Sequence, residues 1–367
     1  MIEVTEAKTD QEIKEFIRFP FELYKKDPFY SPELIKDQKE HFSPANPFFR
    51  NADVRFFLAR KEGKTVGRVT SIVNQQHIRY HNEKAGFFGF FESRNDPGIA
   101  NTLLDTVSKD LKGAGMTVMR GPMDFSTNEQ CGFMIEGFHE PPMLMTPYNP
   151  PYYPELMQQC GMIKAKDLLA FILDVPEKLP EKVLRVAALA ERRGIKIRQV
   201  EKKKFIEELR AFKDVYNEAW NSNWGFIPLT DDELEYLGKR LKPIAPPEMT
   251  LIAEKDGKPV GFLGLLPDFN LLLRKMKGRL NAISILKALY YQRTITDLRL
   301  LLLGVKSAYR HRGVDALMFR EAFKAARKRH KRVEMSWILE DNEPVIRIIE
   351  MFGSSLYKRY RIYEKNI

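Results

Sequence analysis

A short basic run after an apolar segment is the part of this sequence best able to bind an anion. Residues 298–305 predict a strand, and residues 316–329 predict a helix. The first N–H groups of a helix lack partners within the helix, and its dipole adds positive charge there. Gly313 lets a phosphate approach the backbone, and Arg310 and Arg312 add full charges. The run therefore predicts a phosphate-binding loop.

The same run resembles the acyl-CoA loop of the GCN5-related N-acetyltransferases, whose pattern is Q/R-x-x-G-x-G/A. Arg310 and Gly313 match its leading positions. Five of the six positions agree, and the sixth is Asp315, where Gly or Ala is usual. In the preceding segment, usually V-x-P-x-Y/F-R, Ser307 stands where proline is usual. The carboxylate at 315 would lie beside the pyrophosphate unless it points away.

A second segment extends the resemblance. Residues 332–341 predict a buried strand, after which Asn342 opens a helix that ends at Gly353. This Asn-to-Gly spacing resembles the second half of the acetyltransferase signature. Residues 356–363 then predict a last strand. Family members often place a tyrosine seven residues after the Asn, as general acid to the thiolate, where this chain has Ile349.

The resemblance implies an acyl-CoA donor, acetyl-CoA by default or a longer acyl-CoA, and an amine acceptor. Backbone N–H groups at Gly304 and Val305 would hold the carbonyl oxygen. Asn342 would contact the pantetheine or only cap its helix. The predicted cofactor-binding residues at the loop are Arg310, His311, Arg312, Gly313, Val314, Asp315 and Ala316.

No motif defines the acid and base of such a transfer. Tyr357, Tyr360 and Tyr363 in the last strand are possible replacements for the missing tyrosine, although a tyrosine there often only packs. Glu340 is another candidate near a strand end, whereas Glu334 is expected away from the splay between the strands. Because proximity and orientation carry much of an acyl transfer, a dedicated base is not obligatory.

The elements that would position these groups occur twice. Residues 58–67 and 252–261 share a strand, a charged Gly turn and a second strand, which predicts a β-hairpin in each half. Residues 149–161 likewise mirror 342–353 in spacing. Such self-similarity indicates a repeated fold.

We therefore predict an α/β (α+β) protein of two tandem acyl-CoA N-acyltransferase (GNAT-like) domains, each a mixed, mostly antiparallel sheet flanked by helices. The Pro-bearing break at 175–180 predicts domains at 1–176 and 177–367. In the first half the acidic turn 92–98 replaces the phosphate loop, and acidic groups oppose a pyrophosphate. We predict a degenerate first domain without a CoA loop and a second domain with one.

Two polar or aromatic stretches predict the acceptor site. One follows the first helix of the second half, where this family usually keeps its acceptor loop. The other is a long Gly- and Pro-rich loop in the first half. Their candidate substrate-binding residues are Trp220, Asn223, Trp224, Phe226, Asn128, Glu129 and His139.

Composition limits the partners. The 367 residues suit two domains, and the net charge of +11 favours anionic partners. No nucleic-acid motif supports DNA or RNA. Two cysteines and no ligand cluster predict neither disulfides nor a metal, and the absence of long apolar runs predicts a cytoplasmic protein. The basic amphipathic stretch 271–291 predicts peripheral membrane or lipid contact, or simple packing.

The leading hypothesis is an acyl-CoA-dependent N-acyltransferase, most simply an N-acetyltransferase. A long-chain enzyme acting on a lipid-like amine, similar to bacterial ceramide synthases, is one alternative. A non-catalytic protein that senses CoA or binds a partner is another, and both Asp315 and Ile349 favour it. Tandem enzymes that transfer aminoacyl groups from transfer RNA share the double fold, but their cofactor half usually lacks the CoA loop.

Overall fold

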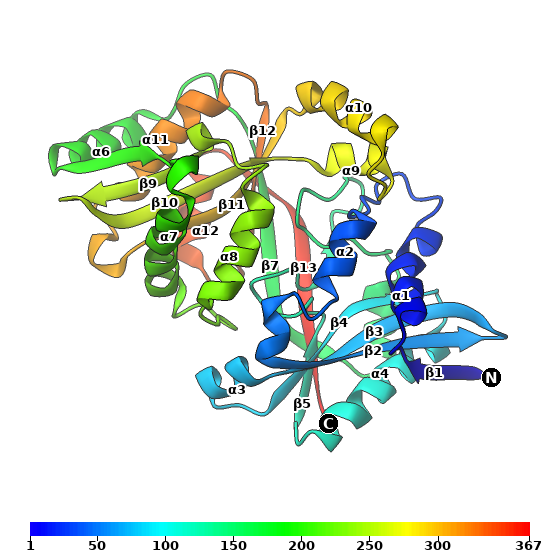
Figure 1. Ribbon diagram of the computed structural model, residues 1–367. Helices are drawn as coiled ribbons and strands as arrows, with labels where there is room; N and C mark the ends of the chain where they lie inside the picture. The colour runs from blue at the N-terminus through cyan, green and yellow to red at the C-terminus, as the bar shows by residue number, and fades with distance from the viewer. The chain divides into compact units, whose positions relative to one another are not determined.

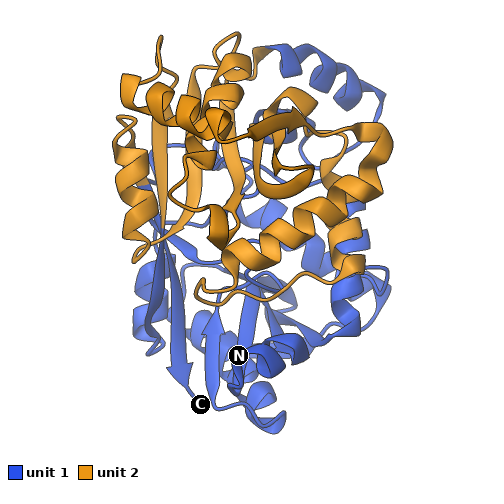
Figure 2. Cartoon of the chain, turned by 90° about the vertical axis from the view of Figure 1, so that its left-hand side faces the viewer, with its two compact units in different colours: residues 1–168, 270–293, 358–367 blue, residues 169–269, 294–357 orange.

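The chain forms two compact units (Figure 2). The computed structural model describes all residues from 1 to 367. Unit 1 comprises residues 1–168, 270–293 and 358–367, and unit 2 comprises residues 169–269 and 294–357. Each unit is a mixed sheet with helices on its faces (Figure 1), which confirms the predicted α/β class.

Unit 1 is built on the strand order β1-β2-β3-β4-β5, with the C-terminal strand beside β5. All neighbours are antiparallel except β4 and β5, which pair in parallel. Its elements are β1 (Ile2–Glu6), α1 (Asp10–Leu23), α2 (Ile35–His41), η1 (Pro47–Arg50), β2 (Ala52–Lys61), β3 (Lys64–Asn74), α3 (Gln75–His81), β4 (Ala85–Ser93), α4 (Pro97–Gly113), β5 (Val118–Gly121), β6 (Phe133–Glu136) and α5 (Tyr153–Gln159).

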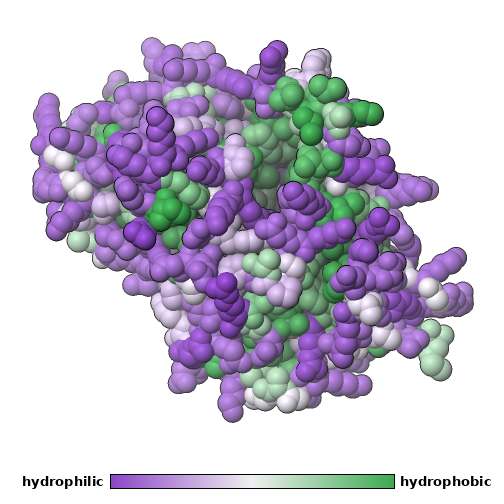
Figure 3. All heavy atoms as spheres, in the orientation of Figure 1, coloured by the Kyte–Doolittle hydropathy of each residue, from purple (hydrophilic) through white to green (hydrophobic).

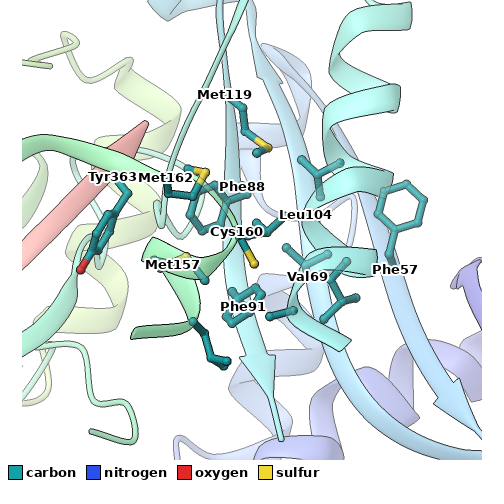
Figure 4. Packing of buried hydrophobic residues seen from close by; sticks show 14 of the residues in the cluster. Phe57, Val69, Phe88, Phe91, Leu104, Met119, Met157, Cys160, Met162 and Tyr363 are labelled. Carbon is teal, nitrogen blue, oxygen red and sulfur yellow. The ribbon is translucent and has the colours of Figure 1, made fainter. Parts of the chain in front are cut away.

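The core of unit 1 lies between this sheet and helices α4 and α5 (Figure 4). Phe88 and Val69 extend from the strands toward Leu104 of α4 and Met157 of α5, and all four side chains are buried. Tyr363 from the C-terminal strand belongs to the same cluster. Apolar residues on one stripe of each helix thus meet alternate residues of the strands.

Unit 2 repeats the plan with the strand order β8-β9-β10-β11-β12. Its neighbours are antiparallel except β11 and β12, which are parallel. Its elements are α6 (Glu181–Arg192), β8 (Ile195–Gln199), η2 (Lys202–Lys204), α7 (Phe205–Trp220), α8 (Asp231–Leu241), η3 (Pro247–Met249), β9 (Thr250–Lys255), β10 (Lys258–Pro267), β11 (Asp297–Val305), η5 (Ser307–Tyr309), α11 (Val314–Ala326), β12 (Arg332–Leu339) and α12 (Glu343–Glu350). Strands β7 (Ile163–Asp174) and β13 (Ser355–Asn366) carry the chain from one unit into the other.

Both predicted hairpins are confirmed. β2 pairs with β3, and β9 pairs with β10, each through a two-residue loop. The loop residues Glu62 and Gly63 have φ of 53° and 75°, and Asp256 and Gly257 have φ of 52° and 75°. Two positive φ values in succession define the hairpin turn that matches strand twist, and they explain the charged residue followed by glycine.

The stretch between β10 and β11 packs with unit 1, although the sequence places it inside the second half. It forms α9 (Asn270–Met276), α10 (Ala282–Tyr291) and η4 (Gln292–Thr294). The Asn270 amide donates to the Pro142 carbonyl at 2.9 Å, and the Gly278 carbonyl accepts from the Ile35 N–H at 3.0 Å. The compact units therefore differ from the ranges 1–176 and 177–367, which remain a proposal about the repeat.

Candidate functional site

The predicted phosphate loop is held in place by the last turn of α7. The Glu218 carboxylate accepts from the N–H and the hydroxyl of Ser307 at 3.2 and 3.0 Å. The Trp220 indole N–H donates to the Leu303 carbonyl of β11 at 3.1 Å. These bonds fix the end of β11 and the start of the loop to one helix.

The N-terminus of α11 is open to an anion. The first helical hydrogen bond runs from the Leu317 N–H to the Gly313 carbonyl at 3.0 Å, so the N–H groups of Val314, Asp315 and Ala316 precede the helical ladder. No side chain caps them, because Gly313 is the N-cap residue. Gly313 has φ 81°, and a Cβ there would lie 2.7 Å from Cγ1 of Val186 in α6. Only glycine fits this close packing.

The two loop arginines differ in what they contact. Arg310 donates to the Ala219 carbonyl at 2.6 Å, so its charge lies on the C-terminal end of α7, where a cation is favoured. The side chain of Arg312 is exposed, and its guanidinium lies 5.6 Å from the Tyr309 ring. His311 is exposed and has φ 58°. We expect Arg312 to contact a phosphate and Arg310 to position the loop.

β11 and β12 pair in parallel only from Asp297 to Leu300, and beyond that point they separate. The Lys306 N–H bonds to the Val260 carbonyl of β10, so alternation turns the Gly304 N–H toward β10 and the Val305 N–H toward the edge facing away from β10. The β10–β11 register shifts by one residue at Leu301, which therefore forms a bulge. On the edge of β11 past Leu300, the carbonyls of Leu303 and Val305 accept from Trp220 and Arg310, so the Val305 N–H is the group turned toward an extended ligand.

A buried polar cluster lies at the point of separation. Arg299 of β11 stands opposite Glu334 of β12, and the exposed fractions of the two residues are 2% and 0%. The Ser336 hydroxyl donates to Glu334 Oε1 at 2.6 Å and accepts from Arg299 Nε at 3.1 Å. The Tyr357 hydroxyl donates to Glu334 Oε2. The Arg299 guanidinium also lies 5.0 Å from the Trp337 ring.

Glu334 was expected away from the splay, and that expectation is wrong. The register places Glu334 one residue before the last β11–β12 pair, Leu300 with Met335. A strand alternates its faces, so Glu334 and Ser336 lie on the face opposite Met335, which packs in the main core. A carboxylate, two hydroxyls and a guanidinium at this position can store and pass a proton.

Comparison with known proteins decides the family. The model of the family described as "Acetyltransferase (GNAT) family" matches residues 209–353, which include β11, the loop and α12. The chain is 32% identical over 363 residues to Protein YghO of Escherichia coli (strain K12), covering 97% of this chain and 93% of the relative. It is also 31% identical over 373 residues to Bacterial ceramide synthase of Caulobacter vibrioides (strain NA1000 / CB15N), covering 99% and 97%. The chain belongs to the GCN5-related N-acetyltransferase (GNAT) superfamily.

Its fold is that of a tandem GNAT protein. The tandem GNAT protein from the clavulanic acid biosynthesis pathway has a TM-score of 0.60 at 11% identity, and the similarity covers 100% of this chain and 98% of that one. The predicted tandem GNAT fold and acyltransferase class are therefore confirmed. GNAT folds generally bind acyl-CoA, and the uncapped N-terminus of α11 fits its pyrophosphate.

The structure shows what surrounds Asn342 and Ile349, two positions of the GNAT signature. The Asn342 side chain is half-buried and does not cap α12, although Asn is a common N-cap. Its amide therefore remains a candidate for the pantetheine. Ile349, at the position of the usual GNAT tyrosine, is buried in the core of unit 2.

The tyrosines of β13 fall into different units. Tyr357 belongs to unit 2 and reaches Glu334, whereas Tyr360 and Tyr363 are buried in unit 1. Burial raises the pKa of Tyr363 to about 12. Glu340 is half-buried in the turn after β12. Tyr357 is thus the one of these tyrosines that the structure joins to an acid–base cluster of unit 2.

The predicted acceptor residues are likewise divided. Trp220 contacts β11 as described, Asn223 and Trp224 are half-buried in the turn after α7, and Phe226 is 4% exposed and packs on Tyr216. Phe226 is therefore a core residue of unit 2. The other three lie in unit 1, where Asn128 and Glu129 are half-buried and His139 is exposed in a turn.

In unit 1 the groups that bind anions in a GNAT domain are occupied by its own carboxylates. The helix α4 is capped by Asp96, whose side chain accepts from the Gly98 N–H at 2.9 Å. The β3–β4 register shifts near Phe90, and the Phe90 N–H donates to Asp124 Oδ1 at 2.7 Å. Burial raises the pKa of Asp124 to about 7. Unit 2 has no side-chain cap at the equivalent helix.

No helix combines the length and apolar character needed to cross a membrane.

Proposed function

We propose that unit 2 binds an acyl-CoA and transfers its acyl group to an amine. The observation that carries this proposal is the uncapped, glycine-started α11 that follows a strand separating from its parallel neighbour. An acyl-CoA supplies an activated thioester carbon, at which the new C–N bond forms as the C–S bond breaks. Val314–Ala316 and Arg312 would hold the pyrophosphate, and the edge of β11 would hold the pantetheine.

We further propose that Tyr357 moves the proton, with Glu334 holding its hydroxyl. The hydroxyl of Tyr357 donates to Glu334, and Ser336 and Arg299 fix that carboxylate in turn. Such a relay can give a proton to the leaving thiolate, the role that Ile349 cannot fill.

For the substrates, we propose a long-chain acyl group and a lipid-like primary amine. The support is the name Bacterial ceramide synthase carried by a relative that is 31% identical over 99% of this chain. A ceramide is the amide of a fatty acid with a long-chain amino alcohol. Acetyl-CoA remains the donor to compare against, because the family match concerns acetyltransferases.

Replacing Arg312 by Gln should weaken CoA binding roughly tenfold or more, because a charge-assisted bond to phosphate is lost. Arg327→Gln is the matched control, since its exposed guanidinium also lies over a ring, Phe323, at 5.7 Å, but at the other end of α11. Titration calorimetry with CoA measures both variants. Equal affinity of the Arg312 variant and wild type would exclude Arg312 from the site.

We also propose that α10 rests on an anionic lipid surface. Leu280, Ile283, Leu286 and Tyr290 are between 54% and 70% exposed, and Figure 3 shows apolar side chains gathered where Figure 1 draws α10. Residues 270–293 contain six Lys and Arg residues and no Asp or Glu. Apolar side chains flanked only by cations match a membrane surface carrying acidic lipids.

Replacing both Ile283 and Leu286 by Glu should abolish sedimentation with phosphatidylglycerol vesicles, because it removes apolar insertion and adds repulsion. Leu184→Glu with Leu189→Glu is the control, since these leucines of α6 are also exposed, at 42% and 45%. Wild type should bind neutral phosphatidylcholine vesicles much less. Equal sedimentation of wild type and the α10 variant would contradict the proposal.

A non-catalytic CoA sensor is the second candidate, favoured by Asp315 in the first turn of α11 and by the buried Ile349. Calorimetry and thiol release separate the two. A sensor binds CoA and releases no thiol in the presence of an amine, whereas the proposed enzyme does both.

A further inference from the structure

An apolar pocket lies wholly within unit 2, on the face of the sheet covered by α7 and α8. Its empty space is about 920 Å³, a volume that includes solvent at the open mouth. Every lining residue is apolar or glycine except Lys202, Glu208, Lys242 and Thr250. Glu208 is neutralised by Arg198 at 2.7 Å. The lining is thus predominantly apolar.

The pocket begins at the bulge of β11. Leu301, the residue left out of the β10–β11 register, lines it together with Leu302. From there the lining crosses β10 at Phe262–Gly264 and reaches β9 at Leu251 and Ile252. These residues are register neighbours, so the pocket runs across the strands and not along them.

The same bulge adjoins the polar cluster. Leu300 is the last residue of β11 paired with β12, and Arg299 precedes it. Arg299 and Leu302 lie on the face opposite the main core, which holds Leu300 and Leu303. The parity of the strand changes at Leu301, as a one-residue bulge requires. A reacting carbonyl near Leu301 would therefore have the acid–base cluster on one side and the pocket on the other.

Room in the pocket is left by a strand glycine. A Cβ built on Gly264 would meet only Cβ of Leu302, at 3.7 Å, an ordinary contact. Glycine weakens a strand interior, so its presence where a side chain would fit marks space kept open. An apolar cavity without a ligand costs stability, and a hydrocarbon would recover the lost contacts.

We infer that this pocket takes the hydrocarbon chain of the acyl donor and so makes the protein selective for long-chain acyl-CoA. The inference rests on the proposed function, since it needs the thioester near Leu301. The group that fits the pocket is an unbranched alkyl chain, and either the acyl donor or the amine acceptor could carry it. The position of the pocket beside the β11 bulge favours the donor.

The test measures calorimetric binding of CoA, acetyl-CoA, octanoyl-CoA and palmitoyl-CoA to wild type, Gly264→Val and Leu237→Trp. Both substitutions fill the pocket, one from β10 and one from α8. Leu184→Trp on the exposed face of α6 is the matched control. Wild-type affinity should rise with chain length, because each buried methylene stabilises binding. Each pocket variant should lose at least about tenfold for palmitoyl-CoA and keep wild-type affinity for CoA.

Other results overturn the inference. Equal affinities of wild type for acetyl-CoA and palmitoyl-CoA would mean that the pocket is only a packing gap. Unchanged palmitoyl-CoA affinity in both folded variants, with a raised KM for a long-chain amine and not for a short one, would assign the pocket to the acceptor. Failure of CoA itself to bind wild type would instead remove the proposed function, and the donor assignment with it.

Discussion

Replacing Tyr357 by Phe is expected to lower kcat by roughly 10²-fold or more while acyl-CoA binding stays unchanged. The phenyl ring keeps the packing of Tyr357, but the proton that its hydroxyl donates to Glu334 is gone. General acid catalysis contributes roughly 10²–10⁴-fold. Steady-state kinetics of thiol release measure the loss.

Tyr363→Phe is the control for this prediction. Tyr363 lies on the same strand, is 2% exposed, and its buried hydroxyl has no hydrogen-bond partner. Its substitution should leave kcat near wild type. Unchanged kcat in the Tyr357 variant would exclude the proton role. A fall in the Tyr363 variant alone would move the search for the acid into unit 1.

Replacing Arg299 by Met is expected to lower the free energy of unfolding of unit 2 by about 3–5 kcal/mol, because it leaves the buried Glu334 carboxylate without its cation. Arg299 is 2% exposed and its Nε lies 3.5 Å from Glu334 Oε1. Urea denaturation measures the change. The double variant Arg299→Met with Glu334→Leu should recover much of the loss, since no charge stays buried.

Arg332→Met is the matched control, because Arg332 pairs with Asp297 at 2.7 Å on the same two strands. Its side chain is 34% exposed and that of its partner is 21% exposed. Half-exposed pairs contribute about 0–1 kcal/mol. Equal losses in the two single variants would show that burial does not set the strength of the Arg299 pair.

Hairpin turns and the start of a helix can be predicted from the sequence, because a few neighbouring residues determine them. Both residues of the turns Glu62-Gly63 and Asp256-Gly257 have positive φ, and an acidic residue followed by glycine in the sequence predicts such a turn. Gly313 marks the start of α11 for the same reason, although the helix begins at Val314 and not at Ala316. These features depend on a few neighbouring residues, so the sequence alone reveals them.

Contacts between distant segments could not be predicted in this way. Arg299 and Glu334 interact because β11 and β12 are parallel in one register, and neither residue signals this alone. The sequence showed only a basic residue within one apolar strand, Arg299, and an acidic residue within another, Glu334. The bulge at Leu301 also depends on register. The packing of residues 270–293 with unit 1 depends on distant partners such as Pro142.

Thiol release tests most directly whether unit 2 uses acyl-CoA to acylate an amine. The purified protein is incubated with palmitoyl-CoA and a long-chain amino alcohol. Free thiol is followed with a chromogenic disulfide, and the amide product is identified by mass spectrometry. We expect amine-dependent thiol release with one amide formed per thiol, and little of either from the Tyr357→Phe variant. No thiol from palmitoyl-CoA or acetyl-CoA with any amine, from a protein that binds CoA, would contradict the claim.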